Sequence, residues 1–143
     1  MIYNKEINKA IKLAYEKHQG QFDKNGLPYV FHPWHLAEQM IDEDSIIVAL
    51  LHDILEDTDT SVTDLVAMGF KKEVIDTLVI LNHHEDTDYF EYIKMIAQNE
   101  LAKKVKLADL YHNADLTRLD NVSEKDLIRS KKYQESIDYL NTH

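Results

Sequence analysis

The chain has 143 residues, of which 44% are hydrophobic, and this length suits one domain with a sizeable core. It has no cysteine, so disulfides and thiolate chemistry are excluded and any metal ion must have nitrogen and oxygen ligands. Its net charge of −10 argues against general binding to nucleic acids or anionic membranes. Since no stretch is apolar enough for a membrane span or a signal peptide, we expect a cytoplasmic protein, and homo-oligomer formation stays open.

The first third of the chain predicts two helices joined by a loop. Apolar residues recur with helical spacing over residues 4–18, and an Asn-Gly turn followed by Pro28 marks the loop. Lys24 lies in this loop, where binding groups are common. A second helix is expected to begin near His32 and Pro33, because proline is tolerated in a first helical turn.

The stretch from Asp44 to Asp57 is expected to form one central helix, which Asp44 and Ser45 would cap. Residues 46–51 are apolar without a break, so this helix should be buried. Burying His52 and Asp53 within it costs several kcal/mol unless a partner satisfies them, and a divalent cation would do so. The alternative is a core histidine bonded to a backbone carbonyl, with Asp53 as its buried partner.

The second half predicts five more helices. Ser61 and Asp64 form a capping box before a short helix, helices follow over residues 71–81, 88–98 and 101–112, and a second capping box at Ser123 and Asp126 opens the last one. The polar patch over residues 82–86 is interpreted as a solvated helix end rather than a metal site. With only three glycines and two prolines, the chain favours an all-helical fold, with residues 1–143 as one domain.

Four candidate metal ligands lie on three different predicted helices: His32, His52, Asp53 and Asp109. Asp109 is a carboxylate on an apolar stripe and therefore also needs a partner. Helical bundles build metal centres from side chains of several packed helices. Two imidazoles with two carboxylates suit Mn, Fe, Co or Zn better than Ca.

Three stretches carry a resemblance to a known family. They read HQGQFDKNGLPYVFHP, IIVALLHDILEDTDTSVTDL and VKLADLYHN, and together they resemble the HD-domain metal-dependent phosphohydrolases of the RelA/SpoT group. The likeness runs from about residue 8 to residue 119 and is to the hydrolase domain in its stand-alone form, the small alarmone hydrolases. It implies an all-helical HD-domain bundle that hydrolyses guanosine tetra- and pentaphosphate to GDP or GTP plus pyrophosphate, usually with Mn²⁺.

The resemblance also implies roles for individual residues. His32, His52, Asp53 and Asp109 match the metal ligands, and Glu56 with Asp57 matches the pair that orients and activates water. Lys24 and Asn113 match positions that contact a nucleotide substrate. Where the family commonly has arginine before this lysine, the chain has Asp23, which cannot stack on a base or bind phosphate.

We expect Glu56 to act as the general base of this hydrolysis. Lys106 is interpreted as a solvent-facing helix lysine, with a phosphate contact as the alternative. Two further functions remain open: an HD phosphohydrolase acting on another nucleotide, such as an adenosine alarmone or a phosphorylated dinucleotide, and a non-catalytic metal-binding nucleotide sensor. The intact Glu56–Asp57 pair argues against the sensor, which would not need a water-activating carboxylate.

Overall fold

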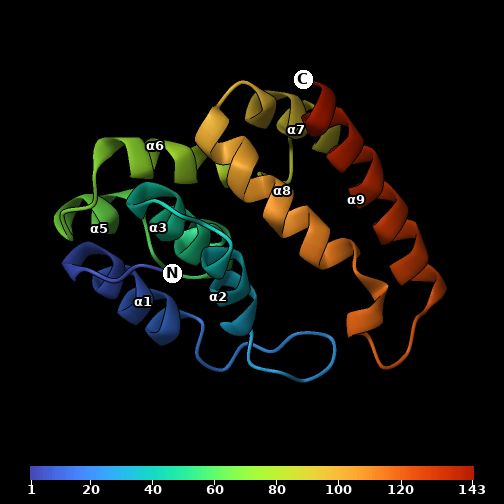
Figure 1. The fold of residues 1–143 in the computed structure, drawn as a ribbon, viewed down its shortest axis with the longest axis horizontal. Coiled ribbons are helices and arrows are strands. Elements are labelled where there is room, and N and C mark those ends of the chain that lie inside the picture. The colour runs from blue at the N-terminus through green and yellow to red at the C-terminus, as the bar shows by residue number, and fades with distance from the viewer.

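A computed structural model describes residues 1–143 as nine α-helices and one short 3-10 helix, without a β-strand, which confirms the all-helical prediction (Figure 1). In chain order the elements are α1 (Lys5–Lys17), α2 (Phe31–Glu38), α3 (Glu43–Leu51), α4 (Ile54–Asp57), α5 (Val62–Ala67), α6 (Lys72–Leu81), α7 (Tyr89–Ala97), α8 (Glu100–Ala114), η1 (Leu116–Arg118) and α9 (Glu124–Thr142). None of the helices combines the length and the apolarity needed to cross a bilayer.

Local capping chemistry sets several helix starts. The two predicted capping boxes are present, with Ser61 and Asp64 opening α5 and Ser123 and Asp126 opening α9. Helix α3 starts earlier than predicted, because Asp42 rather than Asp44 or Ser45 accepts the hydrogen bond from a free N–H of the first turn.

Helix α3 lies at the centre of the fold, between α1, α2, α6 and α8 (Figure 1). Every residue from Ser45 to Leu51 is buried, as the apolar run predicts. Burying one large aliphatic side chain contributes about 1.5–3 kcal/mol, so the buried aliphatic residues of α3 make a large contribution to core stabilisation. The buried helix therefore holds the residue that directly follows it, His52, in a fixed position.

The predicted central helix is not continuous. Helix α3 ends at Leu51, a turn follows at residues 52–53, and the single helical turn α4 begins at Ile54. Asp53 has φ −102° and ψ 5°, which leaves the α-helical region. The prediction of one continuous helix from Asp44 to Asp57 is therefore wrong, and a turn places the side chains of His52 and Asp53 instead.

The loop between α1 and α2 reaches across to the junction of α8 and α9 (Figure 1). The Asn25 side chain donates to the carbonyl of Arg118, and Lys24 pairs with Asp126 at the start of α9. Gly26 adopts a φ of 79° in the turn of this loop, which favours glycine. These contacts attach the loop to the side of the molecule formed by the α8–α9 pair.

Candidate metal centre and adjoining cavities

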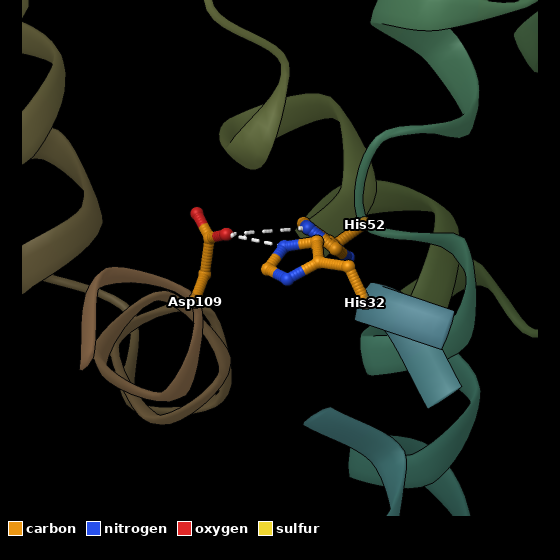
Figure 2. Close-up of side chains that lie close together, drawn as sticks. All are labelled: His32, His52 and Asp109. Atoms are coloured by element: carbon orange, nitrogen blue, oxygen red, sulfur yellow. Dashed lines mark hydrogen bonds and ion pairs between the residues drawn. The ribbon is translucent and has the colours of Figure 1, made fainter. Parts of the chain in front are cut away.

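Three buried side chains from distant parts of the sequence meet at one point. His32 extends from α2, His52 from the turn after α3 and Asp109 from α8 (Figure 2). Nε2 of His32 lies 2.8 Å from Oδ1 of Asp109, and Nε2 of His52 lies 3.5 Å from the same oxygen. One ligand atom from each residue lies within 4.8 Å of the others, so the three can bind one ion together.

The orientation of the His52 ring fits a metal ligand. Its Nδ1 lies 2.8 Å from the carbonyl oxygen of Ala49, and a carbonyl can only accept, so Nδ1 carries the proton. The neutral ring then has its lone pair on Nε2, which is buried without a hydrogen-bond partner. The hydrogen bond from His52 to a backbone carbonyl, which a core histidine would make, is therefore present. It leaves Nε2, the nitrogen that a metal ion would bind, without a partner.

Asp53 lies beside this group. Its Oδ2 is 3.1 Å from Nε2 of His52 and accepts a hydrogen bond from the hydroxyl of Tyr29. Burial and the neighbouring Asp109 carboxylate raise the pKa of Asp53 well above its usual range. A cation between the two carboxylates would remove this repulsion, so the donor set fits a divalent ion.

Asp109 is held by two further side chains of α8. Lys106 Nζ lies 2.9 Å from Oδ2, and the Asn113 amide donates to Oδ1 at 2.9 Å. Burial alone raises the pKa of Asp109, but Lys106 and then His32 hold it well below its usual range. The prediction that Lys106 faces solvent is wrong, because only 13% of its side chain is exposed.

His112 contacts the ring nitrogen of His32 that does not face Asp109. The Nδ1 atoms of the two rings lie 2.6 Å apart, and His112 also stacks on His35 with ring centres 4.1 Å apart. Burial, and then the neighbouring His32 and Arg118, lower the pKa of His112 to about 3. Nδ1 of His32 is thus engaged with His112, and Nε2, which contacts Oδ1 of Asp109, is the nitrogen directed at the candidate metal centre. The sequence places His112 on the same face as Asp109 but does not show this role.

The predicted water-activating pair lines a cavity of about 280 Å³ at the candidate centre, which we call the metal-side cavity. Glu56 and Asp57 lie in its wall together with Asp53 and Asp109. Oε1 of Glu56 accepts a hydrogen bond from the backbone N–H of His83 at 3.0 Å. The interpretation of residues 82–86 as a solvated helix end is therefore wrong for His83, which is half-buried and faces this cavity, while residues 84–86 are exposed.

A second cavity of about 360 Å³, the loop-side cavity, adjoins the first and shares Asn113 and Tyr133 with it. Lys24 lines this cavity rather than the metal-side cavity and pairs with Asp126. Asn113 stands where the two cavities meet. The structure thus brings the candidate metal ligands, Glu56, Asp57 and Asn113 together and places Lys24 in the adjoining loop-side cavity.

Asp23 stands where the family commonly has arginine, and its carboxylate accepts hydrogen bonds within its own turn. Its Oδ1 accepts the backbone N–H groups of Asn25 and Leu27 at 2.9 and 3.0 Å, and Oδ2 lies 3.9 Å from the guanidinium of Arg118. An aspartate at this position therefore shapes the loop and faces an arginine supplied by another element.

Comparisons with known proteins were made by family model, by sequence and by structure. No family model matches the chain. It is 48% identical over 64 residues to guanosine-3′,5′-bis(diphosphate) 3′-pyrophosphohydrolase of Aquifex aeolicus, which covers 42% of this chain and 9% of that protein. It is 35% identical over 150 residues to GTP pyrophosphokinase of Myxococcus xanthus (92% of this chain, 19% of that protein). It is 32% identical over 123 residues to the bifunctional (p)ppGpp synthase/hydrolase SpoT of Escherichia coli (76% and 18%).

The fold also matches a solved structure, described as that of a metazoan ortholog of SpoT that hydrolyses ppGpp. The TM-score is 0.77 at 24% identity, over 98% of this chain and 88% of that one. Fold and site define an all-helical HD-type domain with a His, His, Asp centre. The chain belongs to the RelA/SpoT family, as its sequence relatives show. It spans less than a fifth of the length of these curated relatives.

Proposed function

We propose that the chain hydrolyses guanosine 3′,5′-bis(diphosphate) and related alarmones to GDP or GTP plus pyrophosphate, with a bound divalent ion, by preference Mn²⁺. The observation that carries the proposal is the unsatisfied Nε2 of His52, which faces Asp109, while Asp109 and Glu56 line the same cavity. The names of the sequence relatives support the substrate class. Residues 1–143 would act as one domain, in the cytoplasm, without nucleic acid or membrane as partner.

His32, His52, Asp53 and Asp109 would hold the ion. Such an ion supplies Lewis acidity toward a phosphoryl oxygen and acidifies water. Glu56 would accept the proton of the water that attacks the 3′-diphosphate, a role typically worth about 10²–10⁴-fold in rate. Asp57 would orient that water or Glu56.

The remaining residues would bind substrate. The nucleoside would lie in the loop-side cavity with Lys24 in contact with phosphate, and Asn113 would meet the ribose where the two cavities join. The hydrogen bond from His83 to Glu56 would keep the carboxylate directed at the cavity. As the water oxygen bonds to phosphorus, the bond between the 3′ oxygen and phosphorus would break. The 3′ oxygen would take up the proton that Glu56 accepted, and pyrophosphate would leave from the metal-side cavity.

A panel of nucleotides incubated with Mn²⁺ tests this proposal, with products resolved by chromatography. We expect pyrophosphate from guanosine 3′,5′-bis(diphosphate), and loss of most turnover in Glu56→Gln protein that still binds metal. Near-native turnover in that variant would show that Glu56 is not the base. Absence of pyrophosphate from every nucleotide would overturn the proposed activity.

A second candidate keeps the chemistry and changes the nucleotide. It rests on Asp23, whose carboxylate faces Arg118 and two backbone N–H groups instead of presenting a guanidinium to a base. Adenosine alarmones and phosphorylated dinucleotides in the same panel distinguish it from the first. Nucleotide binding without any product would instead indicate a non-catalytic sensor.

A further inference from the structure

The metal-side cavity has an excess of negative charge. Four carboxylates line it, from Asp53, Glu56, Asp57 and Asp109, against two ammonium groups, from Lys106 and Lys132. A diphosphate would meet repulsion there unless cations compensate. The availability of the two lysines therefore decides how the cavity receives such a group.

Lys106 is already engaged. Its Nζ is buried against Oδ2 of Asp109 at 2.9 Å and lies 5.2 Å from the centre of the Tyr92 ring. Moving it to a ligand would leave the Asp109 carboxylate without its cation, which is costly in a buried position. Lys106 thus serves the candidate metal ligand.

Lys132 has different surroundings from Lys106. It comes from α9, and its Nζ lies 4.1 Å above the Tyr89 ring and 5.9 Å from the centre of the Tyr133 ring. Both rings belong to the cavity wall, and no carboxylate lies within ion-pair distance of this ammonium. An aromatic face holds a cation in position without neutralising it, so the charge of Lys132 remains available.

We propose that Lys132 binds the diphosphate group that is released from the substrate. This inference rests on the proposed function and adds a substrate-binding residue from α9. An ammonium there would form a charge-assisted hydrogen bond to a phosphoryl oxygen. It would also offset the negative charge of the diphosphate whose phosphorus the water attacks.

The neighbouring Lys131 offers a matched control. It is an exposed lysine on the same helix, but successive residues of a helix point about 100° apart, and Lys131 does not line the cavity. Lys131→Gln and Lys132→Gln remove the same charge from adjacent positions. Lys132→Arg keeps a cation at the cavity.

The test is calorimetric binding of inorganic pyrophosphate at a fixed excess of Mn²⁺, with thermal melts to confirm that each variant is folded. We expect Lys132→Gln to raise the Kd roughly tenfold, as for the loss of one partly hydrated charge-assisted hydrogen bond. Lys131→Gln should stay within about twofold of the unaltered protein, and Lys132→Arg should bind nearly as well. Equal affinities of Lys132→Gln and the unaltered protein, equal losses in both Gln variants, or no pyrophosphate binding by the unaltered protein would each overturn the proposal.

This readout is independent of turnover. If no nucleotide in the panel releases pyrophosphate, the proposed hydrolysis fails, while the comparison of Kd values still decides whether Lys132 binds a diphosphate. If hydrolysis occurs and the Kd values do not differ, only the assignment of Lys132 fails.

Discussion

Removing one partner of the Lys106–Asp109 pair should destabilise the fold strongly, because the other charge is then buried without its counter-charge, and Lys106→Met tests this. Methionine keeps most of the apolar stem and removes the ammonium. The two side chains are 13% and 6% exposed, and their charged atoms are 2.9 Å apart. Breaking a buried pair by removing one partner costs about 3–5 kcal/mol. Because Asn113 and His32 still contact Asp109, at 2.9 and 2.8 Å, we expect the lower end, about 3 kcal/mol.

Urea unfolding of metal-free protein measures this loss, with Lys104→Met as the control. Lys104 is on the same helix, but it is 44% exposed and its ion pair with Asp42 spans 3.4 Å, so its loss should cost less than about 1 kcal/mol. With an unfolding entropy of about 0.3 kcal/mol/K for 143 residues, 3 kcal/mol corresponds to a melting temperature lower by about 10 °C. A cost below about 1 kcal/mol for Lys106→Met would refute the assignment of a buried charged pair.

The pH dependence of the same pair follows from its pKa shifts. The pKa of Asp109 lies below its usual 3.8, so the unfolded chain takes up a proton first and the stabilisation is lost on acidification below that value. The pKa of Lys106 lies above its usual 10.5, because Asp109 and Tyr92 outweigh burial, so that contribution is lost only as pH rises through the folded value. The pair should therefore be intact across the neutral range.

Three further predictions concern other parts of the site. Adding Mn²⁺ should raise the melting temperature of the unaltered protein but not of His52→Ala, because only folded protein with its ligands binds the ion; equal shifts would contradict the ligand assignment. His83→Pro removes the backbone N–H that donates a hydrogen bond to Glu56, whereas His83→Ala keeps it. Turnover should therefore fall about 10–100-fold in His83→Pro and much less in His83→Ala. Equal losses would show that the imidazole ring, and not the backbone N–H, matters. Burial, and then His32, lower the pKa of His112 from the usual 6.5 to about 3, so metal-free protein should lose stability as pH falls below 6.5. An NMR titration of His112 with a midpoint near 6.5 would show that its ring is not buried as described.

Features that depend on neighbouring residues could be predicted from the sequence. The capping boxes of α5 and α9 involve residues three apart, and the burial of α3 follows from an uninterrupted apolar run. The meeting of His32, His52 and Asp109 was also predictable in outline, because His52 and Asp109 are polar groups among apolar residues that need a partner, and the family resemblance adds His32.

Features that depend on contacts across the fold could not be predicted. Lys106 has the spacing of a surface lysine, and only the packing of α8 against the core and α7 reveals that its side chain is largely covered. The partner of Lys24 is Asp126, 102 residues later, and that of Glu56 is the backbone of His83. The turn at residues 52–53 carries no glycine or proline signal, so the sequence favoured a continuous helix.

The candidate centre joins residues 77 positions apart, from α2 and α8, so no short fragment of the chain contains it. An ion bound there closes a long loop and acts as a reversible cross-link between the two halves of the core. Its binding energy is gained only after those halves have packed, which means that the ion should slow unfolding more than it speeds folding. Resistance to proteases would thus report whether the site is filled, even in the absence of any substrate.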